Sequence, residues 1–179
     1  MIQEENDMKN ELSRRDFLRL SGAVMAAVAL GGALTGCGYD AKPVEVRPFT
    51  NELTAGNCKV TFLTVGGSKS FDIVQQVTLK VENLGSEAIT LEKADFAVMA
   101  NDSRKLELNS CTELVSGAAT GQKDVLTIAA EKEMEISLWF EKDSQLAADT
   151  VNTVTASVTI NGVTVSAIEQ KENFKWWYG

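Results

Sequence analysis

The sequence contains no histidine, and only two prolines and three cysteines occur among its 179 residues. The lack of histidine removes the commonest general base, the commonest metal ligand and every nucleophile that an imidazole ring activates. Positive charge is also scarce, because 17 basic residues stand against 25 acidic ones and leave a formal net charge of −8. Such a surface repels phosphate backbones, so we expect no nucleic-acid partner.

Catalytic and cofactor motifs are missing as well. The sequence has no Gly-x-Ser-x-Gly elbow, and the segment from Gly66 to Ser70 lacks the spacing of a phosphate-binding loop, so it is predicted to form a turn. The acidic residues of predicted turns do not alternate as calcium ligands do, and we expect them to be solvated. These residues are Asp95, Asp102, Asp124, Asp143 and Asp149. We therefore expect no catalytic residue, no cofactor and no metal.

The most specific pattern lies in residues 1–36. The run Ser13-Arg14-Arg15-Asp16-Phe17-Leu18-Arg19 resembles the twin-arginine export motif, in which a Ser or Thr precedes paired arginines, Phe and Leu. The apolar stretch that follows is diluted by glycines and falls short of the roughly 20 apolar residues that span a bilayer. It is therefore predicted to be a signal segment. The acidic residues before Met8 depart from the usual basic start and leave Met8 as an alternative translation start.

The apolar stretch ends in Leu34-Thr35-Gly36-Cys37, which resembles a lipobox. The resemblance implies cleavage before Cys37, a diacylglycerol on its thiol and a further acyl chain on the new amino group. Two or more acyl chains give stable anchoring, whereas a single chain binds only marginally. We therefore expect a lipid-anchored protein on the extracytoplasmic side of the cell membrane, with membrane lipid as its first partner.

Residues 37–57 are predicted to be the lipidated cysteine and a tether. Both prolines fall in this segment, and few of its residues are apolar. At about 3 Å per residue, some 20 residues would hold a domain up to roughly 60 Å from the lipid surface. Part of the segment could instead form a first edge strand.

Residues 58–170 have the period of β-strands. Apolar and polar residues alternate, as in Val77, Leu79 and Val81, and this places the apolar side chains on one face of a strand. The dipeptide Asn161-Gly162 predicts a type I′ hairpin. We expect an all-β domain, an immunoglobulin-like antiparallel β-sandwich of about seven to nine strands, with a closed barrel as the alternative.

A second resemblance supports this fold class. The segment from Val77 to Glu87, followed by strands up to Phe140, is similar to the telokin-like immunoglobulin-like domains of bacterial lipoproteins. The similarity covers roughly residues 58–167, and its main motif is a strand that ends in Val81-x-Asn83-x-Gly85. Residues 129–132 depart from the Pro-Gly turn that is common in the family. The family has no assigned general function, so the resemblance implies a fold and not an activity.

Two cysteines, Cys58 and Cys111, remain after lipidation of the first. Outside the cytoplasm they could form a disulfide, whose closed loop of about 53 residues would contribute roughly 4 kcal/mol. The alternative is two separate thiols, at least one of them buried among the strands. A catalytic redox pair is not expected, because the two are not spaced as Cys-x-x-Cys.

The last segment, residues 171–179, is dense in aromatic side chains. It contains four of the twelve aromatic residues of the chain, Phe174, Trp176, Trp177 and Tyr178. One interpretation is a last strand whose Phe174, Trp176 and Tyr178 cover the domain's own core. The other is an interaction tail, because Trp and Tyr favour protein interfaces and the headgroup zone of bilayers.

We expect a membrane-tethered, non-catalytic lipoprotein that binds another component of the cell envelope, such as a protein partner. The contact surface could be a sheet edge, a loop or the aromatic tail. One alternative is an accessory subunit of an exported enzyme or transporter complex, since the twin-arginine route carries folded proteins. A second alternative is an envelope hydrolase that uses carboxylates, because paired acids can be distant in sequence.

Overall fold

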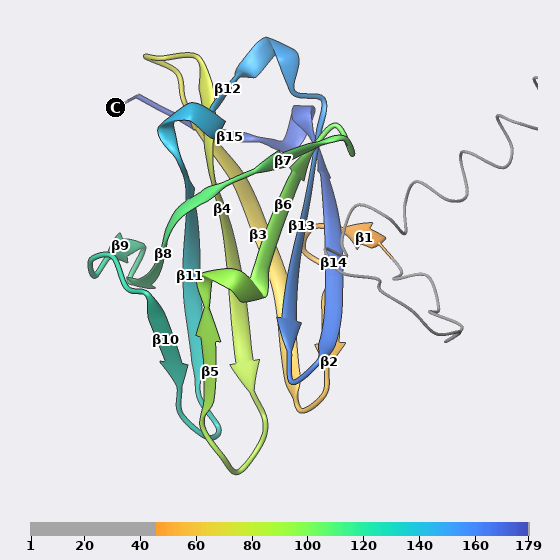
Figure 1. Ribbon diagram of the computed structural model, residues 1–179, viewed down its shortest axis with the longest axis vertical. Coiled ribbons are helices and arrows are strands. Elements are labelled where there is room, and N and C mark those ends of the chain that lie inside the picture. The colour runs from red at the N-terminus through yellow and green to blue at the C-terminus, as the bar shows by residue number, and fades with distance from the viewer. Residues whose placement is uncertain (1–45, 179) are drawn as a thin grey trace, which may run out of the picture. The chain divides into compact units, whose positions relative to one another are not determined.

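The computed structural model describes residues 46–178, which form two packed β-sheets joined by turns and short 3-10 helices (Figure 1). The predicted all-β sandwich is confirmed. The barrel alternative is not, because the strands belong to separate sheets with open edges. The export motif and Leu34-Thr35-Gly36-Cys37 lie outside the described residues.

One layer is a five-stranded sheet in the order β1, β14, β13, β6, β7. Its strands are β1 (Val46–Pro48), β14 (Val163–Gln170), β13 (Thr153–Ile160), β6 (Phe96–Ala100) and β7 (Arg104–Leu106). All neighbours are antiparallel except β1 and β14, which run parallel. The chain enters the domain at this edge, beside one of its last strands.

The other layer is an eight-stranded sheet with the central order β15, β3, β4, β11, β8, β9. These strands are β15 (Lys175–Trp177), β3 (Cys58–Ser68), β4 (Ile73–Asn83), β11 (Glu133–Phe140), β8 (Leu108–Val115) and β9 (Ala118–Ala119). Two short strands complete the sheet, since β2 (Glu52–Ala55) pairs with β3 and β12 (Leu146–Ala147) pairs with β4. β15 is parallel to β3.

A separate two-stranded ribbon and four turns of 3-10 helix make up the rest. The ribbon pairs β5 (Ile89–Glu92) with β10 (Val125–Ile128). The helical turns are η1 (Lys93–Asp95), η2 (Lys142–Ser144), η3 (Ala148–Thr150) and η4 (Lys171–Asn173). Between residues 46 and 178, no helix has the length and apolar character needed to cross a membrane.

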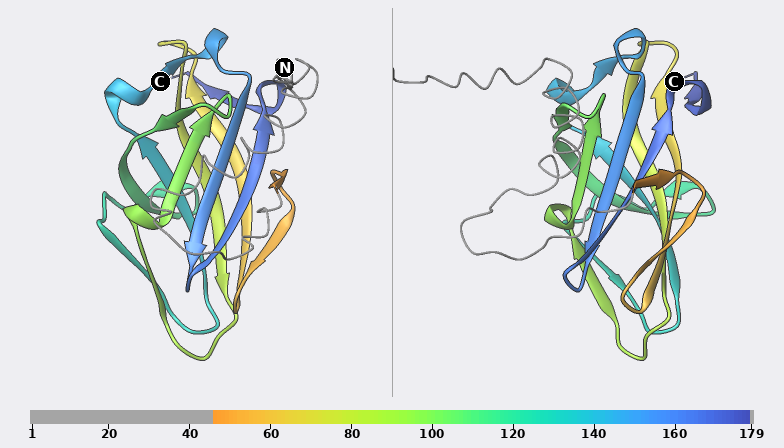
Figure 2. Two further views of the ribbon diagram at one scale, coloured as in Figure 1. Left: turned by 45° about the vertical axis from the view of Figure 1, so that its right-hand side comes forward. Right: turned by 90° about the vertical axis from the view of Figure 1, so that its right-hand side faces the viewer.

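The core lies between the two sheets and follows the predicted alternation. Val77, Leu79 and Val81 of β4 are fully buried, as are Ile136 and Leu138 of β11. Apolar side chains at every second position of both inner faces therefore interdigitate, as in other β-sandwiches. The two views of Figure 2 show the sheets packed face to face.

The hairpin between β13 and β14 is confirmed. Asn161 has a φ of 50° and Gly162 a φ of 78°, and Ile160 pairs directly with Val163. Two consecutive positive φ angles are what a type I′ turn requires, and asparagine and glycine adopt them at little cost.

Part of the predicted tether belongs to the domain and forms strands at its edge, as the alternative interpretation expected. Residues 46–48 form β1 and residues 52–55 form β2. Phe49, Leu53 and Ala55 are buried in the core, and the Phe49 ring lies 5.5 Å from the ring of Phe62, centroid to centroid. The few apolar residues of the segment are therefore enough to fix it against the sandwich.

Short strands lie at the edges of both sheets. β1, β7, β9 and β15 contain two or three residues each, and β2 contains four. A short outer strand offers few free backbone groups to an incoming strand. The sheet edges, one of the contact surfaces expected from the sequence, are thus poorly suited to pairing with a strand of a partner protein.

Candidate functional site

The two described cysteines are free thiols, so the predicted disulfide is wrong for this structure. The sheet register explains why. Cys58 of β3 pairs with Asn83 of β4. Cys111 lies on β8, three strand positions from β3, and its row crosses β4 at Val77, six residues from Asn83. At about 3.3 Å per residue and 4.8 Å per strand, the two Cα atoms are roughly 25 Å apart. A disulfide needs less than about 7 Å.

Both thiols are buried, which fits the alternative of two separate cysteines. Cys58 is 1% exposed, and Cys111, which is fully buried, donates from Sγ to the carbonyl oxygen of Lys123 at 3.3 Å. Loss of hydration raises the pKa of the Cys58 thiol, and the same cause raises the pKa of Cys111. Both groups are therefore poor nucleophiles and act as apolar core residues.

The aromatic tail packs mainly on its own domain. Phe174 is buried and Trp176 packs against the core, while Trp177 is half-buried on the opposite, outer face of the sheet. Tyr178 is 83% exposed, so it does not cover the core as one interpretation expected. Of the predicted interaction tail, Phe174 and Trp176 pack on the core, Trp177 keeps part of its ring in contact with solvent, and Tyr178 is exposed.

Two glycines of β3 make room for the tryptophans. A Cβ atom on Gly66 would overlap the ring of Trp177, and one on Gly67 would overlap the carbonyl oxygen of Ile73 and the ring of Trp176. Gly66 and Gly67 therefore belong to strand β3 and lie beneath the indole rings. The turn that was predicted at residues 66–70 begins only after Ser68. The expected turn was wrong there because close approach, not chain reversal, selects these glycines.

The turn between β3 and β4 carries a second exposed aromatic residue, Phe71, which is 71% exposed. Tyr178 lies beside the same turn, because the amide of Lys69 donates to the carbonyl of Trp177 at 2.8 Å and its Nζ lies 5.0 Å from the Tyr178 ring centroid. We call Lys69, Phe71 and Tyr178 the aromatic end. It combines apolar rings with a cation, a pairing common at interfaces.

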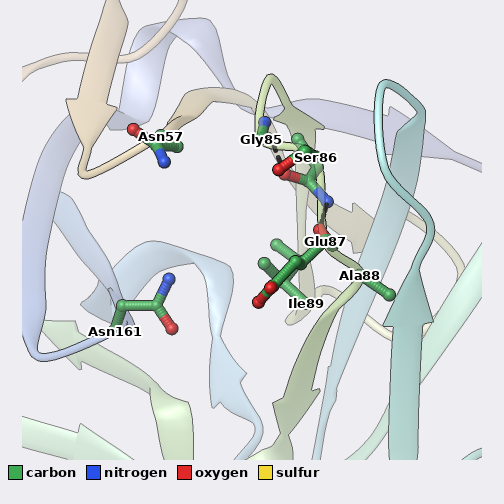
Figure 3. A pocket seen from close by; sticks show the side chains of 8 residues that line it. Asn57, Gly85, Ser86, Glu87, Ala88, Ile89 and Asn161 are labelled. Carbon is green, nitrogen blue, oxygen red and sulfur yellow. Dashed lines mark hydrogen bonds between the residues drawn. The ribbon is translucent and has the colours of Figure 1, made fainter.

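At the other end of the strands, a cleft of about 210 Å³ lies between three loops. Figure 3 shows Asn57 and Asn161 on one side and the loop from Gly85 to Ile89 on the other. The lining is polar, with the carboxylate of Glu87 as its charged group.

Asn83 holds this loop in place. It is 1% exposed, and its Oδ1 accepts from the amide of Gly85 at 3.0 Å. Its Nδ2 donates to the carbonyl oxygens of Glu87, Ile128 and Ala129 at 2.8, 3.2 and 3.1 Å. The motif Val81-x-Asn83-x-Gly85 thus joins two loops, and its asparagine is structural because its polar atoms are already used.

A second cleft contains two carboxylates, Glu107 and Glu141, together with Lys93 and Lys105. Glu107 forms an ion pair with Lys105 at 3.0 Å, and both side chains are 62% exposed. A general acid of a glycosidase usually sits in apolar surroundings that raise its pKa. Glu107 and Glu141 are both exposed to solvent, and Glu107 is already paired with a lysine. No cluster of three or more potential metal ligands occurs within residues 46–178.

The comparisons with known proteins bear first on the N-terminal segment. The family described as the TAT (twin-arginine translocation) pathway signal sequence matches residues 11–31. The chain carries a twin-arginine export signal. The predicted export motif is confirmed by this match, and it indicates export across the cytoplasmic membrane.

No curated protein is significantly similar to this chain in sequence. Among solved structures, a candidate lipoprotein, ycdA, of Bacillus subtilis matches with 18% identity and a TM-score of 0.49. The match covers 71% of this chain but only 40% of that protein. An uncharacterized β-sandwich protein of Clostridium difficile 630 matches with 10% identity and a TM-score of 0.45, over 74% of this chain and 99% of that one. The yjhA protein of Bacillus subtilis matches with 10% identity and a TM-score of 0.47, over 68% and 98%.

Proposed function

We propose that this protein is an exported lipoprotein, anchored through acylated Cys37, whose β-sandwich binds another component of the cell envelope without catalysing a reaction. The observation that carries the proposal is the order of motifs. The matched export signal ends at residue 31, and Leu34-Thr35-Gly36-Cys37 follows at once. A cysteine at the end of an export signal, in this context, is the usual acceptor of a diacylglycerol.

The chain length supports a close tether. Since β1 begins at Val46, only the residues between 37 and 46 separate the lipid from the first strand. At about 3.3 Å per residue these nine steps reach at most roughly 30 Å, half of what the sequence had indicated. A domain held this near the bilayer meets its own membrane and its neighbours, and the aromatic end is one exposed surface for such a contact.

Cell fractionation tests the export signal and the lipid anchor. Changing Arg14 and Arg15 to lysine should block export, and Cys37→Ala should move an exported protein from the membrane to the soluble fraction. Retention of the Cys37→Ala protein in membranes would contradict the lipid anchor. Leu84→Ala, an exposed change in the domain, serves as the control that leaves both unaltered.

Crosslinking in intact cells tests the binding role. Residue 178 is replaced by a photoreactive amino acid, with position 115, exposed in β8 at the other side of the domain, as the control position. A specific adduct at 178 alone would support a contact at the aromatic end. An adduct with a subunit of an enzyme or transporter would favour the accessory-subunit alternative.

A further inference from the structure

On the outer face of the eight-stranded sheet, two tryptophans and a glutamine form one row. The ring of Trp177 covers Gly66, Gly66 pairs with Gln76 of β4, and Gln76 pairs with Trp139 of β11. Both indoles are half-buried, so part of each ring faces solvent. The solvent face of a sheet is usually polar, and two large rings in this place indicate a contact with something outside the domain.

Beside Trp139 the same face is hollowed into a groove of about 360 Å³, which we call the Trp139 groove. It lies between β8, the end of β11 and the loop that follows β9. Its polar lining consists of Asn109, Ser110, Thr112, Gln122 and Gln145. Amides and hydroxyls both donate and accept hydrogen bonds, so the groove is suited to a ligand that does the same.

None of the described residues that line the Trp139 groove is charged, although 23% of the residues of the chain are. Three other clefts of the domain each contain charged side chains, such as Glu87, Glu107 and Glu52. A neutral lining on an acidic protein favours a neutral ligand, because an ion would find no counter-charge there.

Ser110 is a second, independent indication. It pairs directly with Trp139, so both side chains lie on the outer face. The residue is 6% exposed, and its Oγ has no hydrogen-bond partner within the described part of the chain. A buried hydroxyl without a partner is unfavourable and uncommon. A ligand hydroxyl that reaches Ser110 would supply the missing partner.

We infer that the Trp139 groove and the adjoining row bind a neutral sugar chain of the cell envelope. An indole ring covers the apolar C–H face of a sugar, while amides and hydroxyls exchange hydrogen bonds with its hydroxyl groups. The Trp177 ring lies over Gly66 of β3, which is two strand positions from Trp139 of β11, about 10 Å, so linked sugars would cover both tryptophans. This inference rests on the proposed function and names the class of envelope component that the tethered domain holds.

Calorimetric titration of the full exported protein, purified in a detergent without a sugar headgroup, tests the inference. The ligands are neutral oligosaccharides of glucose, galactose, mannose and N-acetylglucosamine, and an oligogalacturonate is the anionic comparison. We expect a neutral oligosaccharide to bind, with a dissociation constant between roughly 10 µM and 1 mM. Preference for oligogalacturonate, or no neutral ligand bound at about 10 mM, would overturn the inference.

Variants locate the binding. Trp139→Ala should weaken it about tenfold, and Gln122→Ala by a smaller factor. Ala119→Arg, which fills the groove without removing a contact of the core, covers the case in which Trp139→Ala does not fold. Phe71→Ala, an exposed aromatic at the aromatic end, should bind as the parent does.

Ser110 has a matched control in Ser166, the other buried hydroxyl without a partner, which lies on β14 of the opposite sheet. Ser110→Ala should weaken sugar binding, whereas Ser166→Ala should not. Equal affinities of the parent, Trp139→Ala and Ala119→Arg would refute the groove as the site. A protein adduct in cells without sugar binding would refute the inference and leave the proposed function standing.

Discussion

Replacing Asn83 by alanine should destabilise the domain more than any exposed change at the same cleft. The side chain is 1% exposed and makes four hydrogen bonds to backbone groups of two loops. Its two N–H groups serve three carbonyls, so we count three full bonds. At about 1 kcal/mol for each, the free energy of unfolding should fall by about 3 kcal/mol.

Urea unfolding, followed by circular dichroism, measures this change. With a denaturant slope of about 2 kcal/mol per molar, the midpoint should fall by about 1.5 M. Asn83→Asp should be at least as destabilising, although it keeps the volume, because a carboxylate oxygen would then face three carbonyl oxygens. Hydrogen exchange should show that the Gly85 amide loses its protection in Asn83→Ala, whereas Asn83→Asp keeps an acceptor oxygen for this amide.

Asn57→Ala is the matched control. Asn57 lines the same cleft and is exposed, and its side chain forms no hydrogen bond within the described residues. It should change stability by less than about 0.5 kcal/mol. If Asn83→Ala costs no more than Asn57→Ala, or if Asn83→Asp is as stable as the parent, the hydrogen-bond account of the motif is refuted.

Three further predictions concern the core and the last strand. Gly66→Ala should destabilise the domain by about 1–3 kcal/mol because the new methyl group overlaps the ring of Trp177, and the cost should be much smaller in a Trp177→Ala background. Urea unfolding of the two single variants and the double variant measures this coupling. Additive changes would contradict the packing of Trp177 on Gly66. Cys58 and Cys111 should react with iodoacetamide only after unfolding, as followed by intact mass. Burial raises the pKa of both thiols in the folded protein above the ordinary 9.0, so the thiols of the unfolded chain ionise first as the pH rises. The free energy of unfolding should therefore fall above about pH 9. A double variant with Cys58→Ala and Cys111→Ala should lose this contribution. Deleting residues 174–179 removes β15 and the buried Phe174, and should lower the melting temperature markedly, while Tyr178→Ala should leave it unchanged.

The strands of the core could be predicted because their information is local. From Val77 onward each apolar residue of β4 is followed by a polar one, and that period alone fixes the side of the sheet that Val77 and Leu79 face. The Asn161-Gly162 hairpin is local in the same way, since two adjacent residues determine the sign of two φ angles.

The short edge strands could not be predicted in the same way. β1 and β15 contain three residues each and pair in parallel with distant strands, so neither shows a period that a sequence window would detect. Gly66 and Gly67 look like a turn because the tryptophans that need the space lie about a hundred residues later in the sequence. The predicted disulfide was wrong for a related reason, because the sequence does not show which rows of the sheet Cys58 and Cys111 occupy.

The Trp139 groove was also invisible in the sequence. Gln76, Ser110 and Trp139 come from three strands and meet only because the register places them in one row. Trp139 by itself fits a core strand as well as an outer face. One sign was present, since Trp139 falls out of step with the core residues Ile136 and Leu138, and a tryptophan on the polar phase of a strand is uncommon.

The pairing of β1 with β14 and of β3 with β15 has a consequence for the order of events in the cell. The five-stranded sheet is complete only once β14 has been translated, and the eight-stranded sheet only once β15 has been translated. Contacts this distant in sequence form late and slow the folding of β-proteins. A translocase that accepts finished domains must therefore wait until β1 has paired with β14 and β3 has paired with β15.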